Sequence, residues 1–316
     1  MTQSLVIKSP LKYVLISPAH NEEAFIQKTL DSMVAQTLLP ERWIIVDDGS
    51  TDRTAEIAES YEKQYPWIEL LRRPRGSDRS FAGKVYAFNL GLGRVASLTF
   101  EVLGNLDADL SFDPDYLAFL MEKFLDDPKL GVAGTPFTEN GGYDTADDSF
   151  EGENHVAGGC QLFRRRCFEA IGGYVPNRIG GVDWIAVTTA RMKGWKTKSF
   201  SEKRFHHYRM LGTAESSTVG ASFSYGKKDY CLGGSPLWQV FRVAYWMTKQ
   251  PIDAVALLFG YCWAAIRRMG RPISHELMRF HRREQMQKLA AILSAVLRFK
   301  KVDSFRVITA QNRGSL

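Results

Sequence analysis

Two aspartates stand two residues apart where an apolar run ends. They are Asp107 and Asp109, in the stretch EVLGNLDADLSF (residues 101–112). Close like charges raise each other's pKa unless a cation lies between them, and carboxylate oxygens favour Mg²⁺ or Mn²⁺, which also bind phosphate. The pattern predicts a divalent-metal site for a substrate phosphate, with the cation arriving in the substrate complex rather than as a fixed lysine. Capping of the next helix is the alternative.

Three other stretches carry polar side chains that suit a nucleotide. SPAHNEE (residues 17–23) contains Pro18 and Glu22, VDDGS (46–50) contains Asp48, and FAGKVYAFNLGL (81–92) contains Lys84. A carboxylate after a strand can accept hydrogen bonds from a base or a ribose. A lysine near a helix start opposes the helix dipole, which a nearby phosphate would explain. A helix cap, an ordinary Asp-Gly turn and a solvated lysine are the competing interpretations.

Two stretches in the second half carry chemistry of a different kind. Asp183 follows two glycines and precedes Trp184 in GGVDW, where a carboxylate can act as a general base beside a stacked sugar, or simply as an N-cap. His207 and Arg209 lie in FHHYR (205–209). His207 could be a further metal ligand, and Arg209 could bind a diphosphate through two hydrogen bonds. A basic surface loop is the alternative.

The elements that must position these residues alternate across about the first 135 residues. Hydrophobic runs and helical periodicity predict strands at 13–17, 42–50, 67–73, 101–109 and 130–137, with helices at 22–36, 52–65, 83–95 and 114–125. Alternation of this kind predicts a parallel sheet with helices on both faces. Ligands then bind beyond the carboxyl ends of the strands, where SPAHNEE, VDDGS and DAD all fall.

The rest of the chain is less regular. Residues 137–154 are acidic and rich in glycine, and we expect a long surface loop. A strand with a short helix follows at 158–173, then a helix after Gly180 and Gly181, and from Pro236 onward the pattern is helical, amphipathic and finally basic. The apolar segment 252–266 is too short to span a bilayer and favours a buried or interfacial helix.

Composition narrows the class of protein. The chain has 316 residues, 45% of them hydrophobic, and a net charge of +6 that is concentrated after residue 264. A basic tail favours an anionic partner, either lipid or nucleic acid. The four cysteines have no paired spacing, which indicates reduced thiols in a cytoplasmic protein rather than disulfides or a zinc site. No signal peptide, P-loop or G-x-S-x-G motif is visible.

The order and spacing of SPAHNEE, VDDGSTDRT, AGKVYAFNLGL, NLDAD, GGCQLFRRRCFEAIGGY and GGVDW resemble the family 2 glycosyltransferases, an inverting group with the GT-A fold. The resemblance covers residues 13–210. It implies a donor nucleoside pocket lined by Pro18, Glu22 and Asp48, with Lys84 nearby. It also implies a metal on the nucleotide diphosphate, held at Asp107 and Asp109 with His207 as a further ligand. Asp183 would be the catalytic base. Asp109 is the expected direct ligand, while Asp107 would bind the diphosphate or reach the ribose.

The sequence departs from the family pattern in three ways. The usual acidic pair is VD here, which leaves one carboxylate. No Q-x-x-R-W follows and multiple spanning helices are not expected, and these two departures favour addition of a single sugar over polymerisation. The tail resembles bacterial exopolysaccharide-type transferases, with less specific motifs. We therefore expect an α/β protein of the GT-A fold, with a Rossmann-like, mostly parallel sheet and a helical C-terminal extension. The expected domains are 1–235 (nucleotide-sugar half about 1–110, acceptor half about 111–235) and 236–316.

The expected reaction is metal-assisted transfer, using Mn²⁺ or Mg²⁺, from a nucleotide-sugar donor, UDP-sugars being favoured. The acceptor would be a polyprenyl-linked or glycan hydroxyl in bacterial surface polysaccharide synthesis. A nucleotidyltransferase and a non-catalytic nucleotide-sugar-binding protein are the alternatives. The expected location is cytoplasmic, peripheral on the inner face of the plasma membrane. Residues 236–316 would contact that membrane or form a packed helix pair or homodimer interface, and nucleic acid is the weaker partner.

Overall fold

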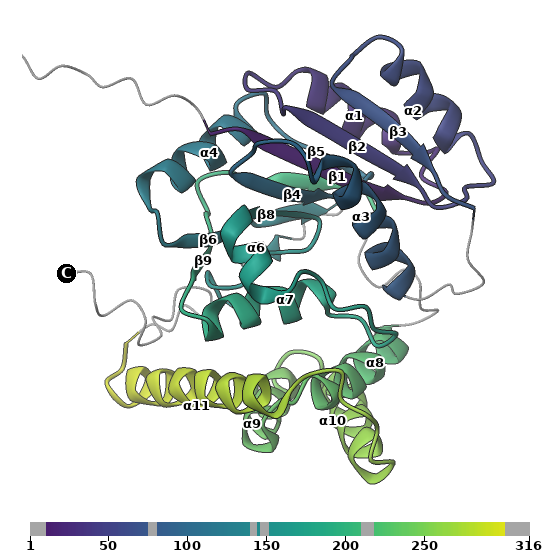
Figure 1. The fold of residues 1–316 in the computed structure, drawn as a ribbon. Helices are drawn as coiled ribbons and strands as arrows, with labels where there is room; N and C mark the ends of the chain where they lie inside the picture. Colours follow the sequence, from purple (N-terminus) through teal and green to yellow (C-terminus); the bar gives the residue numbers. More distant parts are fainter. Residues whose placement is uncertain (1–10, 75–80, 140–143, 146–151, 210–217, 301–316) are drawn as a thin grey trace, which may run out of the picture.

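The computed structural model describes residues 11–74, 81–139, 144–145, 152–209 and 218–300 (Figure 1). The first half alternates strands and helices, as the sequence pattern predicts. Its elements are β1 (Tyr13–Ala19), α1 (Ile26–Val34), β2 (Arg42–Asp47), α2 (Thr54–Glu62), β3 (Ile68–Arg72), α3 (Phe81–Val95), β4 (Val102–Leu106), β5 (Leu110–Ser111), α4 (Tyr116–Asp126) and β6 (Leu130–Gly134).

The second half adds shorter strands and then helices alone. In order, these are β7 (Phe137–Glu139), β8 (Cys160–Arg164), α6 (Arg165–Ile171), α7 (Val182–Met192), β9 (Lys196–Ser199), β10 (Phe205–His207), α8 (Thr218–Cys231), α9 (Pro236–Met247), α10 (Pro251–Ile266) and α11 (His275–Leu297). All four cysteines are free thiols.

A seven-stranded sheet forms the centre of the α/β part, in the order β3-β2-β1-β4-β8-β6-β9. The pairs β3–β2, β2–β1, β1–β4 and β6–β9 are parallel, whereas β8 runs antiparallel between β4 and β6. Alternate residues of each strand face opposite layers: Tyr13 and Leu15 pack with α1, α2 and α4, while Val14 and Ile16 pack with α3, α6 and α7. The predicted mostly parallel sheet with helices on both faces is confirmed.

A second sheet of three short strands, in the order β5-β10-β7, lies at the edge where the site residues gather. β10 pairs antiparallel with β5 and parallel with β7. The expectation of one loop over 137–154 is therefore wrong at its start, since residues 137–139 form β7. The backbone partner of β7 is supplied by residues 205–207, far along the chain, and local sequence does not reveal it. Residues 140–143 and 146–151 lie outside the described part.

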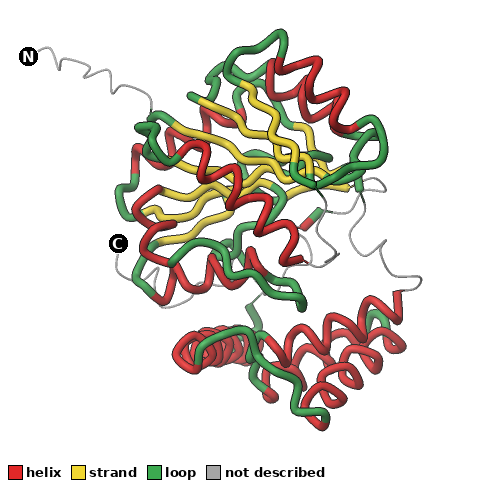
Figure 2. Tube along the Cα trace, turned by 45° about the vertical axis from the view of Figure 1, so that its right-hand side comes forward, coloured by secondary structure: helices red, strands yellow, loops and turns green. Residues whose placement is uncertain are grey.

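The helices α8–α11 gather on one side of the α/β part, beyond α7 (Figures 1 and 2). α8, which precedes the expected boundary at residue 236, packs closely along α10. The buried glycines Gly226 and Gly260 allow this approach, because a Cβ on either would lie 2.0 Å from a backbone oxygen of the other helix. Among the described residues, no helix is long and apolar enough to cross a membrane.

The helical unit is attached to the α/β part through α7. The Arg191 guanidinium makes two hydrogen bonds to the Glu284 carboxylate of α11, at 2.8 and 3.0 Å, and is almost fully buried. The Trp184 ring meets the His281 ring edge to face, with their centroids 4.5 Å apart. α7 therefore contacts the central sheet on one side and α11 on the other.

The close approach of α8 and α10 gives a test of this packing. We expect Gly260→Ala to lower the free energy of unfolding by about 1–3 kcal/mol, because the added methyl group meets the Phe223 carbonyl oxygen, which cannot rotate away. Gly93→Ala in α3 is the matched control, since nothing lies within 4 Å of its Cβ position, and it should be neutral or stabilising by up to about 1 kcal/mol. Urea denaturation measures both, and equal stability of the two variants would contradict the packing.

Candidate functional site

The loops after β1 and β2 are joined by hydrogen bonds beyond the carboxyl ends of these strands. The Glu22 amide donates to Thr54 Oγ1 (2.7 Å), the Thr51 amide donates to Asn21 Oδ1 (2.8 Å), and the Asp48 amide donates to the Ala19 carbonyl (2.8 Å). These hydrogen bonds connect the loops that contain SPAHNEE and DDGSTD, although about 25 residues separate the two in the sequence. Parallel pairing in register, with Pro18 level with Val46, brings them together.

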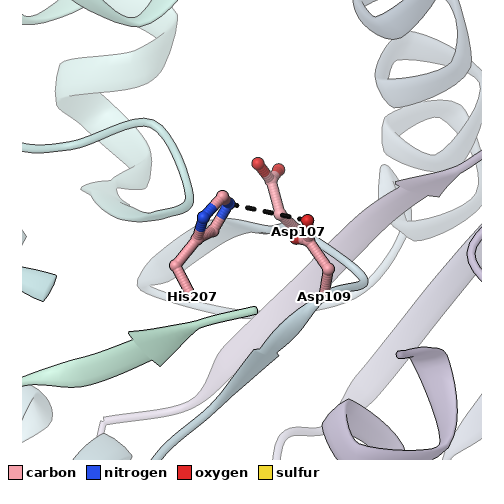
Figure 3. A group of neighbouring side chains, drawn as sticks. All are labelled: Asp107, Asp109 and His207. Atoms are coloured by element: carbon pink, nitrogen blue, oxygen red, sulfur yellow. Dashed lines mark ion pairs between the residues drawn. The ribbon is translucent and has the colours of Figure 1, made fainter. Parts of the chain in front are cut away.

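Asp107, Asp109 and His207 converge at the same edge, and one ligand atom from each lies within 4.8 Å of the others (Figure 3). Asp107 follows β4, and Asp109 immediately precedes β5. Because His207 of β10 pairs with Leu110 of β5, its ring comes to the side of Asp109, with Nε2 3.6 Å from Oδ2. Two carboxylates and an imidazole suit Mn²⁺ or Mg²⁺ with open positions for phosphate oxygens and water.

A buried glutamate that the sequence analysis did not select stands behind His207. Glu139 of β7 pairs with His207 in the parallel β7–β10 register, and its Oε1 lies 3.7 Å from His207 Nδ1. This separation is too long for a hydrogen bond but close enough for an ion pair with a protonated ring. Only the register between β7 and β10 places Glu139 beside His207, and the sequence does not reveal that these two strands pair.

Two basic side chains face the acidic cluster. The Lys84 ammonium pairs with Asp107 Oδ1, so the expectation that no fixed lysine faces these aspartates is wrong. Arg209 lies between two acids, with Nη2 2.6 Å from Glu22 Oε2 and Nε 3.6 Å from Asp109 Oδ2. Protein atoms crowding Lys84 lower its pKa, but the neighbouring carboxylates, led by Asp107, raise it further, and the net shift is upward.

Two acids of this cluster have raised pKa values. Burial raises the pKa of Glu22 to about 7, with Asp109 contributing and Arg209 opposing. Burial and the charge of Asp107 also raise the pKa of Asp109, against the opposing effects of His207, Arg209 and Lys84. The two cations therefore compensate the negative charge only in part, and a divalent ion would complete the compensation.

Asp183 reaches the same cleft from the other half of the protein. It lies in the first turn of α7, after Gly181, whose φ of 73° ends the preceding loop. Gly158 leaves room for the Asp183 carboxylate, since a Cβ there would lie 2.9 Å from Oδ2. The side-chain amide of Asn105 donates through Nδ2 to both the Gly158 carbonyl (2.7 Å) and Asp107 Oδ1 (3.3 Å), which connects this loop to the acidic cluster.

Within the described part of the chain, two of the expected nucleoside residues form no hydrogen bond or ion pair with the three possible metal ligands. Pro18 is the last residue but one of β1, and Asp48 follows β2, where its Oδ1 accepts a hydrogen bond from Arg73 Nη1 at 2.8 Å. Arg73 was not selected from the sequence. The described structure thus places Glu22, Lys84, Asp107, Asp109, His207 and Arg209 in one connected group, with Asp183 beside Lys84 and with Asp48 and Pro18 on its flank.

The sequence of this region matches a known family. Residues 14–155 match the profile described as Glycosyl transferase family 2. The match ends before β8 and β9, so it covers only part of the central sheet. Over 147 residues, the chain is 31% identical to the poly-beta-1,6-N-acetyl-D-glucosamine synthase of Staphylococcus epidermidis, a match that covers 44% of this chain and 32% of that protein. The chain thus spans about a third of the length of this curated relative.

Solved structures share the fold of nearly the whole chain. TarS of S. aureus (residues 1–349, with UDP-GlcNAc) superposes with a TM-score of 0.58 at 16% identity, covering 94% of this chain and 90% of that one. The mannosyltransferase PcManGT of Pyrobaculum calidifontis, with GDP-Man and Mn²⁺, gives 0.56 at 19% identity, covering 94% and 78%. The fold is GT-A, as the sequence predicted.

The raised pKa of Glu22 makes stability depend on pH. Its carboxyl group binds a proton more tightly in the folded protein than in the unfolded chain, so the free energy of unfolding should fall as pH rises from about 4.5 to about 7. Glu22→Gln removes this contribution, and at pH 8 without metal the free energy of unfolding of the variant should exceed that of the parent by up to about 3 kcal/mol. Denaturation in the presence of a chelator at pH 5 and pH 8 measures this difference. Glu23→Gln is the control for charge removal, and identical pH profiles for Glu22→Gln and the parent would refute the argument.

The three-residue cluster predicts which change removes metal binding. Asp109→Asn should weaken Mn²⁺ binding in the presence of UDP at least tenfold, since it removes a buried anionic ligand. Asp127→Asn, whose carboxylate pairs with Lys196 away from the cluster, should leave the affinity unchanged. Electron paramagnetic resonance of unbound Mn²⁺ gives both affinities. Full retention of binding by Asp109→Asn would place the ion elsewhere.

Proposed function

We propose that this protein is an inverting glycosyltransferase that moves a sugar from a nucleotide-diphosphate donor to an acceptor hydroxyl. The observation that carries the proposal is the convergence of Asp107, Asp109 and His207 beside Lys84, with Asp183 approaching the same lysine from α7. UDP-sugars are favoured as donors, and TarS with UDP-GlcNAc supports this choice. The proposed acceptor is a polyprenyl-linked or glycan hydroxyl of bacterial surface polysaccharide synthesis.

In this proposal, Asp109 and His207 hold the metal and Asp107 contacts the bound donor. A divalent ion there would neutralise charge on the leaving diphosphate. Mn²⁺ in the PcManGT structure supports a metal of this kind. Pro18, Glu22 and Asp48 line the nucleoside side of the cleft. Lys84 and Arg209, now paired with site acids, are the cations available to the diphosphate.

Asp183 is the proposed general base. Its carboxylate takes the proton from the acceptor hydroxyl as that oxygen attacks the anomeric carbon. The new carbon–oxygen bond forms on the face opposite the breaking bond to the phosphate oxygen, and the nucleoside diphosphate leaves with that bond's electron pair. One displacement of this kind inverts the anomeric configuration. Domain 1–235 would carry this chemistry, and 236–316 would contact the acceptor's environment.

The base assignment predicts a separation of binding from catalysis. Asp183→Asn should reduce nucleoside diphosphate release at least 100-fold, since it cannot accept the proton, while affinity for the nucleotide changes little. A coupled assay for the released diphosphate and calorimetry with UDP measure the two quantities. Asp115→Asn, a surface acid paired with Lys203, is the control. Equal loss of binding and turnover would refute the role of Asp183.

A screen identifies the donor and separates the proposed reaction from its alternatives. Thermal shifts with nucleotide sugars and Mn²⁺ or Mg²⁺ reveal the donor, after which diphosphate release indicates sugar transfer. Pyrophosphate release from a nucleoside triphosphate and a sugar phosphate would instead indicate a nucleotidyltransferase. Binding without turnover across acceptors would indicate a nucleotide-sugar-binding protein.

A further inference from the structure

The outward face of α10 is a continuous apolar surface. Ile252, Val255, Phe259, Trp263 and Ile266 recur at helical spacing along it and are exposed, Ile252 at 70%, Phe259 at 64% and Ile266 at 81%. Contiguous exposed apolar surfaces often mark interaction sites, whereas single exposed apolar side chains do not. We call these five side chains the outer face of α10.

The opposite face of the same helix is already buried. Ala254, Leu257, Gly260 and Ala264 pack inward, with α8 and α9 as the neighbouring helices. The one charged residue within α10, Asp253, accepts a hydrogen bond from Ser222 of α8 at 3.1 Å. The helix is therefore apolar around most of its circumference, as fully buried helices are, yet the described part of the fold covers only one side.

Cations stacked on aromatic rings flank the outer face at both ends. Before α10, the Lys249 ammonium lies 4.8 Å from the centre of the Tyr245 ring and 5.6 Å from that of Trp246. After α10, the Arg267 guanidinium lies 5.4 Å from the centre of the Trp263 ring, and exposed Arg268 follows it. Aromatic rings with neighbouring basic side chains suit the boundary between lipid headgroups and acyl chains.

We propose that the outer face of α10 docks on an anionic lipid bilayer, with the helix axis lying in the plane of the membrane. Its 16 residues span about 24 Å, and both ends would place cations at the headgroups while the five apolar side chains enter the acyl boundary. Among the described residues 264–300, nine are Lys or Arg and two are Glu, a balance that favours anionic lipids.

A second copy of the chain suits this surface less well. Cations flank both ends of the outer face, so either parallel or antiparallel pairing of two such helices would bring like charges together. A bilayer containing anionic headgroups instead supplies the opposite charge at both ends. The charge pattern therefore selects lipid over self-association.

The docking surface is connected to the catalytic half through α8. A Cβ at Gly181, the N-cap residue just before α7, would lie 3.1 Å from Lys228 Cε of α8, so the helix packed on α10 also lies against the start of the helix that carries Asp183. Docking would thus hold the acceptor side of the cleft near the membrane. This consequence rests on the proposed function, whereas the docking itself does not.

Flotation of the full-length protein with lipid vesicles tests the docking. The vesicles contain equal parts of phosphatidylcholine and phosphatidylglycerol, or phosphatidylcholine alone. We expect the protein to float with the anionic vesicles, and Phe259→Glu or Ile266→Glu to reduce its apparent affinity at least tenfold. Leu39→Glu, which replaces an exposed apolar side chain of the α/β part (44%), should leave flotation unchanged. Circular dichroism confirms that each variant is folded.

Two results would overturn the docking: absence of the parent protein from the floated fraction, or flotation of the Phe259→Glu and Ile266→Glu variants equal to the parent. A lipid-free dimer that dissociates in Phe259→Glu, seen by analytical ultracentrifugation, would reassign the face to self-association. Diphosphate release from the sugar donor, assayed without vesicles in the presence of glycan and detergent-dissolved polyprenyl-linked acceptors, separates this inference from the proposed function. Flotation without any diphosphate release would leave the docking intact and refute the proposed enzyme.

Discussion

The site depends on one strand of three residues. β10 lies between β5 and β7, and this position sets His207 beside Asp109 on one side and Glu139 on the other. Without that pairing, the acids after β4 would face the chain's own cations alone. The short sheet thereby concentrates carboxylates in a partly buried cleft, where burial raises the pKa of both Glu22 and Asp109. The folded protein tolerates that repulsion because Lys84 and Arg209 lie against the acids.

A second constraint acts through α7, which links the cleft to the C-terminal helices. Asp183 is in its first turn, and Arg191 near its other end makes a buried ion pair with Glu284 of α11. Removing one partner of such a pair leaves an uncompensated charge in the interior, so the pair resists separation. The helical unit therefore helps fix the helix that presents Asp183, as well as carrying the outer face of α10.

The sequence predicted the elements better than it predicted the contacts. Hydrophobic runs and turn residues were enough to place β1, β2, β4 and their loops, because parallel strands end at a common edge. The antiparallel insertion of β8, the strand β7 and the role of Glu139 were beyond local patterns, since each depends on pairing with residues far along the chain. Lys84 was selected from the sequence, but its pairing with Asp107 was not expected, because sequence spacing does not say which way a side chain on α3 points.

The ion pairs of the acidic cluster also indicate how binding of a metal and binding of the donor diphosphate would be coupled. Lys84 pairs with an Asp107 oxygen, and Arg209 lies beside an Asp109 oxygen. A metal held by Asp109 and His207 would replace Arg209 at Asp109, and a bound diphosphate would offer both basic side chains phosphate oxygens to pair with. The metal and the diphosphate would then each favour the binding of the other, because either one alone leaves an unbalanced charge in a partly buried cleft.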